Sequence, residues 1–403
     1  MHRWIIASCG DMRPLRPVRR RDDASKSASA SALPPRLRKM GSEAMMLAVP
    51  KDVEEFRTMP AYGHLELFTY DQLKAATGYY SPEQIIGEGG FGVVYKGFIH
   101  GAEVAVKELN PEGLQGDREW LTEVNYLGQY SHPNLVELIG YCCDDDHRLL
   151  VYEYMANGSL ENHLFRRSCN LSWTDRVSIA LDVARGLAFL HGAERPIIYR
   201  DFKTSNILLD AVGHLAYHLN VFYQLDDNSE VRKSEFGCVQ DLKAKLSDFG
   251  LAKEGPMGGK THVSTRVMGT YGYAAPEYMA TGHLTAMSDV YGFGVVLLEM
   301  LVGRRALEPP SSRLAVRQGG SLVDWARPIL IRTKKLEKIL DHRMGLQLPQ
   351  GEHGASPGAV ERVARLAYDC LSQNPKVRPA MERVVRTLEA VLAGDGAALA
   401  IAR

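Results

Sequence analysis

The pattern of apolar residues changes near Gly158, and this change limits the folds that the chain can adopt. Before Gly158, β-branched residues alternate with glycines and predict short strands, whereas afterwards apolar residues recur every three or four positions and predict helices. Strands are expected within residues 85–109 and at 135–139 and 149–154, with one helix at 119–130. Later helices are expected at 177–190, 289–301, 360–371 and 381–392. Because strands and helices do not alternate, the sequence predicts an α+β fold with a small antiparallel-sheet lobe and a larger helical lobe.

The composition is that of a globular protein without a dominant charge. Lysine plus arginine equals aspartate plus glutamate at 48 each, so the charge balance does not favour a nucleic-acid partner. Six cysteines are scattered without metal-binding spacing, and we expect reduced thiols in a cytosolic protein. The best apolar stretch, residues 290–301, contains Glu299 and is shorter than the roughly 18 residues that a membrane span needs. It is therefore expected to be a buried helix.

The two ends of the chain differ from its centre. Residues 1–67 are predicted to be a disordered basic and Ser/Ala-rich region, because residues 1–40 hold ten Arg or Lys against three Asp. Such a segment fits a basic tail drawn to membranes, an organelle transit peptide, or an inert tail, and the inert tail is slightly favoured. Residues 393–403 are expected to form a C-terminal tail.

A glycine-rich segment precedes the first candidate for phosphate binding. Residues 87–94 read GEGGFGVV and place Gly87, Gly89 and Gly92 at GxGxxG spacing. Dinucleotide-binding folds share this spacing, but there a helix follows, whereas here a strand follows. Residues 104–107 read VAVK, so Lys107 ends the next strand and is a candidate ligand for phosphates.

Lys107 needs a carboxylate to orient it. Glu119 and Glu123 lie four residues apart and share one face of the next predicted helix. Glu123 precedes the apolar Leu127 by four residues and can therefore point inward. We assign Glu123 as the partner of Lys107 and keep Glu119 as the alternative.

The decisive segment is residues 199–206, which read YRDFKTSN. Asp201 can accept the proton of an incoming hydroxyl, Lys203 can neutralise a transferring phosphoryl group, and Asn206 can hold a metal ion. Residues 248–250 read DFG, and Asp248 supplies a second metal ligand. The order of the motifs predicts phosphoryl transfer: a glycine flap is followed by a lysine, then this loop, then DFG, and then APE at 275–277.

These motifs together resemble eukaryotic protein kinases over about residues 83–392. More narrowly, the chain resembles the plant receptor-like cytoplasmic serine/threonine kinases, relatives of the Pelle and interleukin-receptor-associated kinases. The sequence segments that carry this resemblance are FTYDQLKAAT at 68–77, LVYEYM at 150–155, YRDFKTSN at 199–206 and GTYGYAAPE at 269–277. The resemblance implies a bilobal kinase fold, with an N-lobe at 83–154 and a C-lobe at 155–392. It also implies ATP and Mg²⁺ or Mn²⁺ as cofactors.

The resemblance also assigns residues to the nucleotide site. It implies Tyr152 as gatekeeper and backbone hydrogen bonds from Glu153 and Met155 to adenine. It implies Asp289 as a buried anchor of the catalytic loop and Arg378 as the partner of Glu277. The residues expected to contact the nucleotide are Gly87, Gly89, Gly92, Val94, Ala105, Lys107, Glu153, Met155 and Leu208.

Serine or threonine specificity follows from Lys203, two residues after the base, together with Thr270. Arg200, beside Asp201, leaves a cation that a phosphate on the activation segment could neutralise. The candidate phosphate acceptors are Ser264 and Thr265, with Thr261 less favoured.

The chain departs from the family pattern in two places. Tyr199 stands where most kinases have histidine, and its ring is expected to pack beneath Phe249. The family has about a dozen residues between the metal-binding asparagine and the DFG aspartate, but here residues 212–240 lengthen the separation. Removing residues 212–240 restores the family spacing. The residues at the two ends of this segment are compatible with the borders of an intron, so we hypothesise that it is a retained intron that has been translated. The alternative to an active kinase is therefore an impaired kinase-like scaffold, while a small-molecule kinase is disfavoured by the full activation segment.

The resemblance implies a cytoplasmic protein that acts on signalling proteins below cell-surface receptors. Its expected partners are protein substrates and upstream receptor kinases, with peripheral association at the inner face of the plasma membrane. No lipidation signal supports that association, and Cys9 is only a weak palmitoylation candidate.

Overall fold

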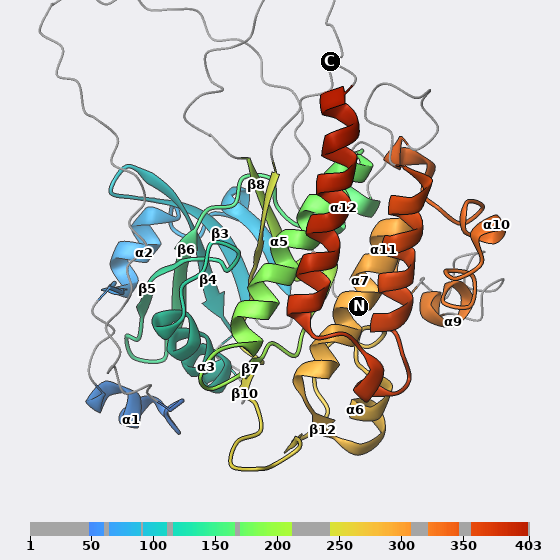
Figure 1. Cartoon of the computed structure of the whole chain (residues 1–403). Helices are drawn as coiled ribbons and strands as arrows, with labels where there is room; N and C mark the ends of the chain where they lie inside the picture. The colour runs from blue at the N-terminus through green and yellow to red at the C-terminus, as the bar shows by residue number, and fades with distance from the viewer. Residues whose placement is uncertain are drawn as a thin grey trace, which may run out of the picture.

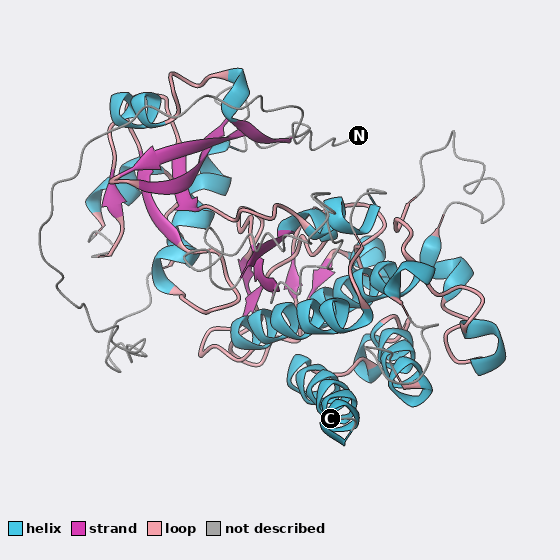
Figure 2. Ribbon diagram, turned by 90° about the horizontal axis from the view of Figure 1, so that it is seen from above, coloured by secondary structure: helices cyan, strands magenta, loops and turns pink. Residues whose placement is uncertain are grey.

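The computed structural model has a strand-rich lobe and a helix-rich lobe (Figures 1 and 2), so the α+β prediction is confirmed. The structure describes residues 48–59, 64–89, 92–110, 116–165, 170–211, 242–307, 321–345 and 356–401. The segment 212–240 therefore lies outside the described residues, as do residues 1–47.

The N-lobe is built on a six-stranded sheet in the order β1-β5-β6-β4-β3-β2. β1 pairs with β5 in parallel, and the other neighbours are antiparallel. The strands are β1 Glu66–Leu67, β2 Ile85–Gly89, β3 Gly92–Ile99, β4 Ala102–Leu109, β5 Leu138–Cys142 and β6 Leu149–Glu153. The lobe's helices are α1 Val53–Thr58, α2 Tyr70–Ala76 and α3 Gly116–Gln129, with the 3₁₀ turn η1 Pro82–Gln84.

The prediction of disorder through residue 67 is wrong for residues 48–59 and 64–67. Asp52 caps α1 by accepting a hydrogen bond from Glu55 N, and Val53 and Phe56 are buried in the main core. β1 can pair with β5 because Gly140 has no side chain: a Cβ there would lie 2.1 Å from Glu66 O. The two apolar residues of α1 are too few for a periodic signal, so local sequence could not reveal this docking.

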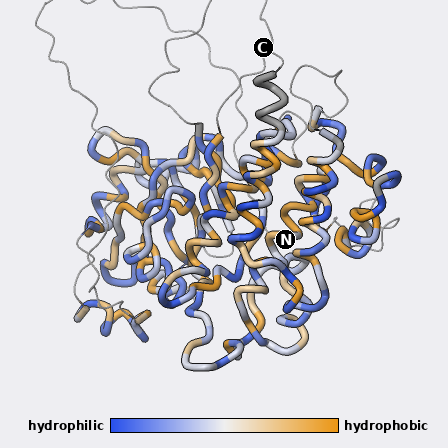
Figure 3. Tube along the Cα trace, in the orientation of Figure 1, coloured by the Kyte–Doolittle hydropathy of each residue, from blue (hydrophilic) through white to orange (hydrophobic). Residues whose placement is uncertain are grey.

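The C-lobe is formed by helices around two buried ones, α5 Trp173–His191 and α7 Ala286–Val302. Capping boxes at Ser172 and Thr285 begin these helices, and Gly303, with φ of 67°, ends α7. Both lie inside the lobe, as Figure 1 shows, and Figure 3 shows many hydrophobic positions among its central helices. The other helices are α4 Leu160–Phe165, α6 Pro276–Thr281, α9 Leu322–Ala326, α10 Thr333–Leu336, α11 Pro357–Cys370 and α12 Met381–Ile401, with 3₁₀ turns η2 Thr204–Asn206, η4 His342–Met344 and η5 Pro375–Val377.

Three two-stranded ladders complete the lobe near the cleft, and each is antiparallel. They pair β7 Ile197–Ile198 with β10 Lys253–Glu254, β8 Ile207–Ala211 with β9 Leu242–Leu246, and β11 Val263–Ser264 with β12 His283–Leu284.

Most element boundaries differ from the sequence expectation by a few residues, and two of these differences have a clear physical cause. The strand expected at 135–139 begins at Leu138, because Val136 N instead donates to Leu246 O in the C-lobe. The tail expected at 393–403 continues α12 to Ile401, since alanine and leucine there favour helix strongly enough to carry it past Gly394. Within the described ranges, no helix is long and apolar enough to cross a membrane.

Candidate active site

A cavity of about 420 Å³ lies between the lobes. Of the residues expected to contact a nucleotide, all but Gly87 line it; Gly87 instead lies buried opposite Val94 in the β2–β3 ladder. The sequence reasoning missed Ile86 and Val136, which also line the cavity and carry no motif of their own. The expected residues in the lining are Gly89, Gly92, Val94, Ala105, Lys107, Glu153, Met155 and Leu208.

Gly92 begins β3 and lines the cavity. Its φ is +139°, and a Cβ at this position would lie 1.9 Å from Glu108 O on β4. Only glycine lets β3 and β4 approach this closely, so the start of β3 lies directly against the strand that bears Lys107.

Lys107 forms two ion pairs, one within the N-lobe and one that joins it to the C-lobe. Its Nζ lies 2.9 Å from Glu123 Oε2 and 3.0 Å from Asp248 Oδ1. Of the two carboxylates considered as partners, Glu123 thus makes the contact, while Glu119 is buried beside Gly250. Burial by itself lowers the pKa of Lys107, but the two carboxylates outweigh it and raise that pKa above its usual value.

Asp248 is held as a carboxylate next to this lysine. Burial would raise its pKa, but the charges of Lys107 and Lys203 outweigh that effect and lower the pKa of Asp248. Phe249 N donates to Glu123 Oε1 at 3.1 Å, so the DFG segment and α3 are fixed to one another. Arg200 and Asp248 both have positive φ, at 76° and 62°, a strained conformation that recurs at functional sites.

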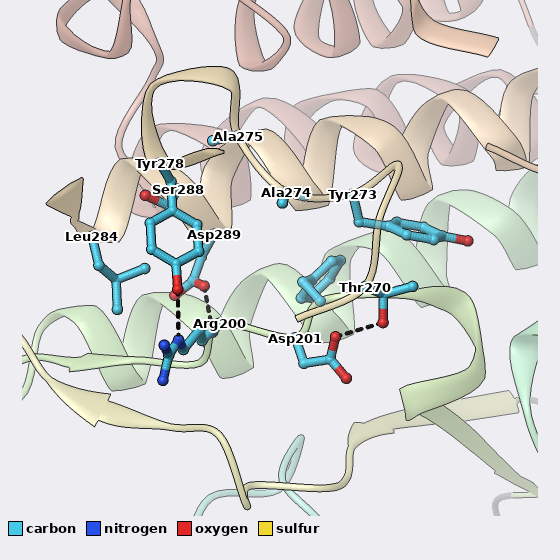
Figure 4. Close-up of a pocket in the computed structure, with 12 residues that line it drawn as sticks. Arg200, Asp201, Thr270, Tyr273, Ala274, Ala275, Tyr278, Leu284, Ser288 and Asp289 are labelled. Atoms are coloured by element: carbon cyan, nitrogen blue, oxygen red, sulfur yellow. Dashed lines mark hydrogen bonds between the residues drawn. The ribbon is translucent and has the colours of Figure 1, made fainter. Parts of the chain in front are cut away.

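Asp201 lies in a small network of hydrogen bonds with three polar side chains. Lys203 Nζ donates to Asp201 Oδ2 at 2.6 Å, and Thr270 Oγ1 donates to Asp201 Oδ1 at 2.7 Å (Figure 4). Lys203 also reaches Thr270 Oγ1 at 3.2 Å, and Asn206 Nδ2 donates to Asp201 O at 3.0 Å. The sequence segments 199–206 and 269–277 therefore meet at one carboxylate.

The β8–β9 ladder brings Asn206 next to Asp248. It runs from Ile207 opposite Leu246 to Ala211 opposite Leu242 without a register shift. Beyond its inner end, Ser247 N donates to Asn206 O at 3.0 Å. Residues 212–240 are thus inserted beyond the tip of the ladder, and the metal-binding candidates lie at its other end.

Further contacts fix this ladder against both lobes. Asn157 N donates to Leu209 O at 3.1 Å, and Asn134 Nδ2 donates to Ala244 O at 3.0 Å. Lys245, which sequence reasoning missed, pairs with the side chain of hinge residue Glu153 at 2.6 Å. No local signal could reveal that pair, because the two residues are far apart in the sequence.

A buried carboxylate anchors the loop that carries Asp201. Asp289 accepts hydrogen bonds from Tyr199 N at 2.8 Å and Arg200 N at 2.7 Å, and His191 Nε2 lies 2.8 Å away. The Tyr199 ring packs edge-on against Phe249 with centroids 5.2 Å apart, and its hydroxyl donates to Ser247 O. A phenol thus links the catalytic loop to the residue before DFG.

The activation segment contacts Arg200 directly, and Figure 4 shows the neighbouring bond from Arg200 to Tyr278 of α6. Arg200 donates to Tyr278 Oη at 3.0 Å, to Thr265 Oγ1 at 3.3 Å and to Arg266 O at 2.6 Å. Ser264 lies on β11 and is exposed. Of the three candidate acceptors, Thr265 is the one whose hydroxyl touches Arg200.

The APE segment is held by an ion pair between the fully buried Arg378 and the partly buried Glu277. Arg378 Nη1 and Nη2 donate to the two carboxylate oxygens of Glu277 at 2.7 and 2.6 Å. This parallel geometry fixes α6 to the loop at Arg378. It thereby supports the segment before α6, which includes Thr270.

The chain matches known proteins over most of its length. The sequence profile described as "Protein kinase domain" matches residues 80–388. The probable serine/threonine-protein kinase PBL17 of Arabidopsis thaliana is 58% identical over 86% of this chain and 71% of its own length. PBL8 of the same plant, also a probable serine/threonine-protein kinase, is 55% identical over 85% and 76%, and its serine/threonine-protein kinase BIK1 is 52% identical over 80% and 75%.

Proposed function

The chain belongs to the protein kinase family, in its receptor-like cytoplasmic serine/threonine group, and we propose that its phosphoryl transfer is carried out by the Asp201 network and the Lys107–Asp248 pair. As a serine/threonine protein kinase it uses ATP and a divalent metal ion.

The nucleotide is proposed to lie in the cavity with its adenine at the hinge. Apolar side chains from both lobes, among them Val94, Ala105 and Leu208, line the cavity and suit a flat aromatic base. Lys107 lies deeper, paired with acids, where a phosphate oxygen could take the place of a carboxylate. Glu123 then holds the ammonium group while it contacts phosphate.

The metal ion is proposed to be Mg²⁺, with Mn²⁺ as the alternative. Asp248 is a carboxylate of lowered pKa, and Asn206 lies beside it, which is the oxygen donor chemistry that Mg²⁺ prefers. In the described part of the chain, no three His, Cys, Asp or Glu side chains gather to hold a metal alone. This fits an ion shared with substrate phosphates, which neutralises charge on the transferring group.

Asp201 is proposed to accept the proton of the attacking hydroxyl. It is buried, and both of its carboxylate oxygens are oriented by hydrogen bonds from Lys203 and Thr270. Lys203 can shift toward the transferring phosphoryl group and neutralise it, while Thr270 keeps the carboxylate in place.

The segment around Thr265 is proposed to be the regulatory switch. A phosphate on Thr265, or on the neighbouring Ser264, would meet the guanidinium of Arg200, which now bonds the neutral hydroxyl. Burial lowers the pKa of Lys253, and the nearby charges of Arg200 and Arg118 lower it further, so several cations already share this region. Phosphosite mapping that finds no phosphate between residues 250 and 270 in active protein would overturn this assignment.

The partners are proposed to be signalling proteins below cell-surface receptors, with no nucleic acid. One relative, 53% identical over 84% of this chain, is named an EPD1-interacting receptor-like cytoplasmic serine/threonine-protein kinase of Gossypium barbadense. We propose a cytoplasmic location, with peripheral association at the inner face of the plasma membrane as the finer hypothesis.

The observation that carries the proposal is the double hydrogen bonding of Asp201 by Lys203 and Thr270. The test is transfer of labelled phosphate from ATP to a serine- or threonine-containing protein substrate. Asp201→Asn should lower kcat by about 10²–10⁴-fold, because general base catalysis contributes that much. Asp71→Asn, on the exposed first turn of α2, is the matched control and should leave kcat unchanged. An Asp201→Asn enzyme with the kcat of the unchanged chain would contradict the assignment.

A further inference from the structure

Helix α1 contacts α3, the helix that carries Glu123. Its residue Phe56 is 8% exposed and packs edge-on against Trp120 of α3, with ring centroids 5.1 Å apart. Phe56 packs in the same way against Tyr141 of β5 at 5.5 Å, and Trp120 against Tyr141 at 5.6 Å. The three rings form a closed aromatic cluster in which each contacts the other two. Such edge-to-face pairs stabilise contacts beyond their buried area.

Trp120 connects this cluster to the core of the N-lobe. Its side chain is fully buried, and Nε1 donates to Leu149 O on β6 at 3.1 Å. Trp120 lies on α3 one turn before Glu123, whose carboxylate reaches Lys107. A displacement of Trp120 would therefore move Glu123 along with the helix.

A cap stabilises the start of α1, and a hydrogen bond at its end attaches it to the sheet. Asp52 caps its first turn, and Arg57 Nη2 donates to Cys143 O, just past the end of β5, at 3.4 Å. In Figure 1, α1 lies beside α3 at the edge of the N-lobe. Residues 53–57 thus bridge α3 and the sheet from outside the part of the chain that the family profile matches, residues 80–388.

We propose that Phe56 is a positioning residue for phosphoryl transfer: through Trp120 it holds α3 where Glu123 can pair with Lys107. This inference rests on the proposed role of the Lys107–Glu123 pair. The physical reason is that a helix bearing a catalytic partner can move away from its lysine unless packing on its outer side opposes that motion. Phe56 supplies that packing, so α1 sets the fraction of molecules in which the lysine is oriented.

The test uses the full chain and five variants. Phe56→Ala removes the ring, Phe56→Leu keeps an apolar side chain, and Lys51→Ala alters an exposed side chain just before the same helix. Glu123→Ala alone and Glu123→Ala combined with Phe56→Ala complete a double-mutant cycle. The readouts are kcat, KM for the protein substrate, and amide hydrogen exchange of residues 116–129, all at a temperature where each variant is folded.

Phe56→Ala is expected to lower kcat at least about fivefold, within the usual range of coupling between sites, and to leave KM for the protein substrate unchanged. Exchange in α3 should rise, Phe56→Leu should restore most of kcat, and Lys51→Ala should match the unchanged chain. In the Glu123→Ala background, adding Phe56→Ala should lower kcat no further. If Phe56→Ala keeps full kcat, or its effect persists undiminished without Glu123, the inference is overturned. If Glu123→Ala itself keeps full kcat, the fault lies in the proposed role of the ion pair.

Discussion

Ser247 N donates a 3.0 Å hydrogen bond to the carbonyl oxygen of Asn206, although the two residues are 41 positions apart in the sequence. The β8–β9 ladder makes this contact independent of what lies beyond its tip. Lengthening a turn from a few residues to about thirty costs only roughly 2 kcal/mol of closure entropy. The hydrogen bonds from Asn134 and Asn157 further hold the ladder in place. The insertion at 212–240 is therefore compatible with an active kinase, and no observation supports the impaired scaffold.

Thr270 should matter for catalysis through its hydroxyl group. Thr270→Ala removes the hydrogen bond to Asp201 Oδ1 and leaves that carboxylate free to rotate, whereas Thr270→Ser keeps the bond. Because a hydrogen bond to a charged group contributes about 1.5–3 kcal/mol, kcat should fall by about ten- to a hundredfold in Thr270→Ala. Steady-state kinetics of both variants checks this. Equal kcat values for alanine and serine at this position would show that the hydroxyl plays no part.

The ion pair between Arg378 and Glu277 should be important for folding stability. The Arg378 side chain is fully buried, so Arg378→Ala leaves Glu277 without its partner and also removes hydrogen bonds to Ser372 O and Met287 O. Breaking one side of a buried pair costs about 3–5 kcal/mol, and a denaturant titration should show a loss of this size.

A double variant separates the pair from its surroundings. Arg378→Met with Glu277→Leu removes both charges, so it should be less destabilised than Arg378→Ala alone. A double variant that is less stable than the single one would mean that the pair itself, rather than the orphaned carboxylate, dominates the loss.

Buried Glu299 should make the stability depend on pH. Burial raises the pKa of Glu299 to about 8, although hydrogen bonds from Ala306 N and Tyr273 Oη lower it in part. In the unfolded chain the carboxyl group titrates near its ordinary value of about 4.3. Between about pH 5 and 8 the unfolded state therefore binds fewer protons than the folded state, and the free energy of unfolding falls as pH rises.

Glu299→Gln removes this titration and is the matched variant. Its free energy of unfolding should change less between pH 5 and pH 8 than that of the unchanged chain, whatever its absolute value. Urea titrations at several pH values measure both slopes. Parallel slopes for the two proteins would contradict a protonated, buried Glu299.

Much of the active site could be predicted from the sequence because its residues lie in contiguous motifs. Asp201, Lys203 and Asn206 share one loop, and their spacing alone places them together. Glu123 was chosen over Glu119 from helical spacing, and it is the residue that contacts Lys107. The assignment of a nucleotide contact to Gly87 was less accurate, because the ladder turns that residue into the sheet rather than toward the cavity.

The parts that sequence could not supply depend on contacts between distant segments. Phe56 is a single aromatic in a charged stretch, and only the position of Trp120 and Tyr141 gives it a place to pack. Lys245 looks like an exposed position of an alternating strand, yet it meets Glu153 across the hinge. The positions of Phe56 and Lys245 depend on tertiary contacts, which no periodicity in the local sequence can reveal.

The most direct test compares phosphoryl transfer by the full chain with transfer by the form that lacks residues 212–240, using Lys107→Met in each as the inactive control. Incorporation of labelled phosphate from ATP, in the same buffer and at equal concentrations of folded protein, is the measurement. The structure predicts comparable rates for the two forms and none for either Lys107→Met control. Incorporation by the shortened form alone would contradict the account and identify the full chain as an impaired scaffold.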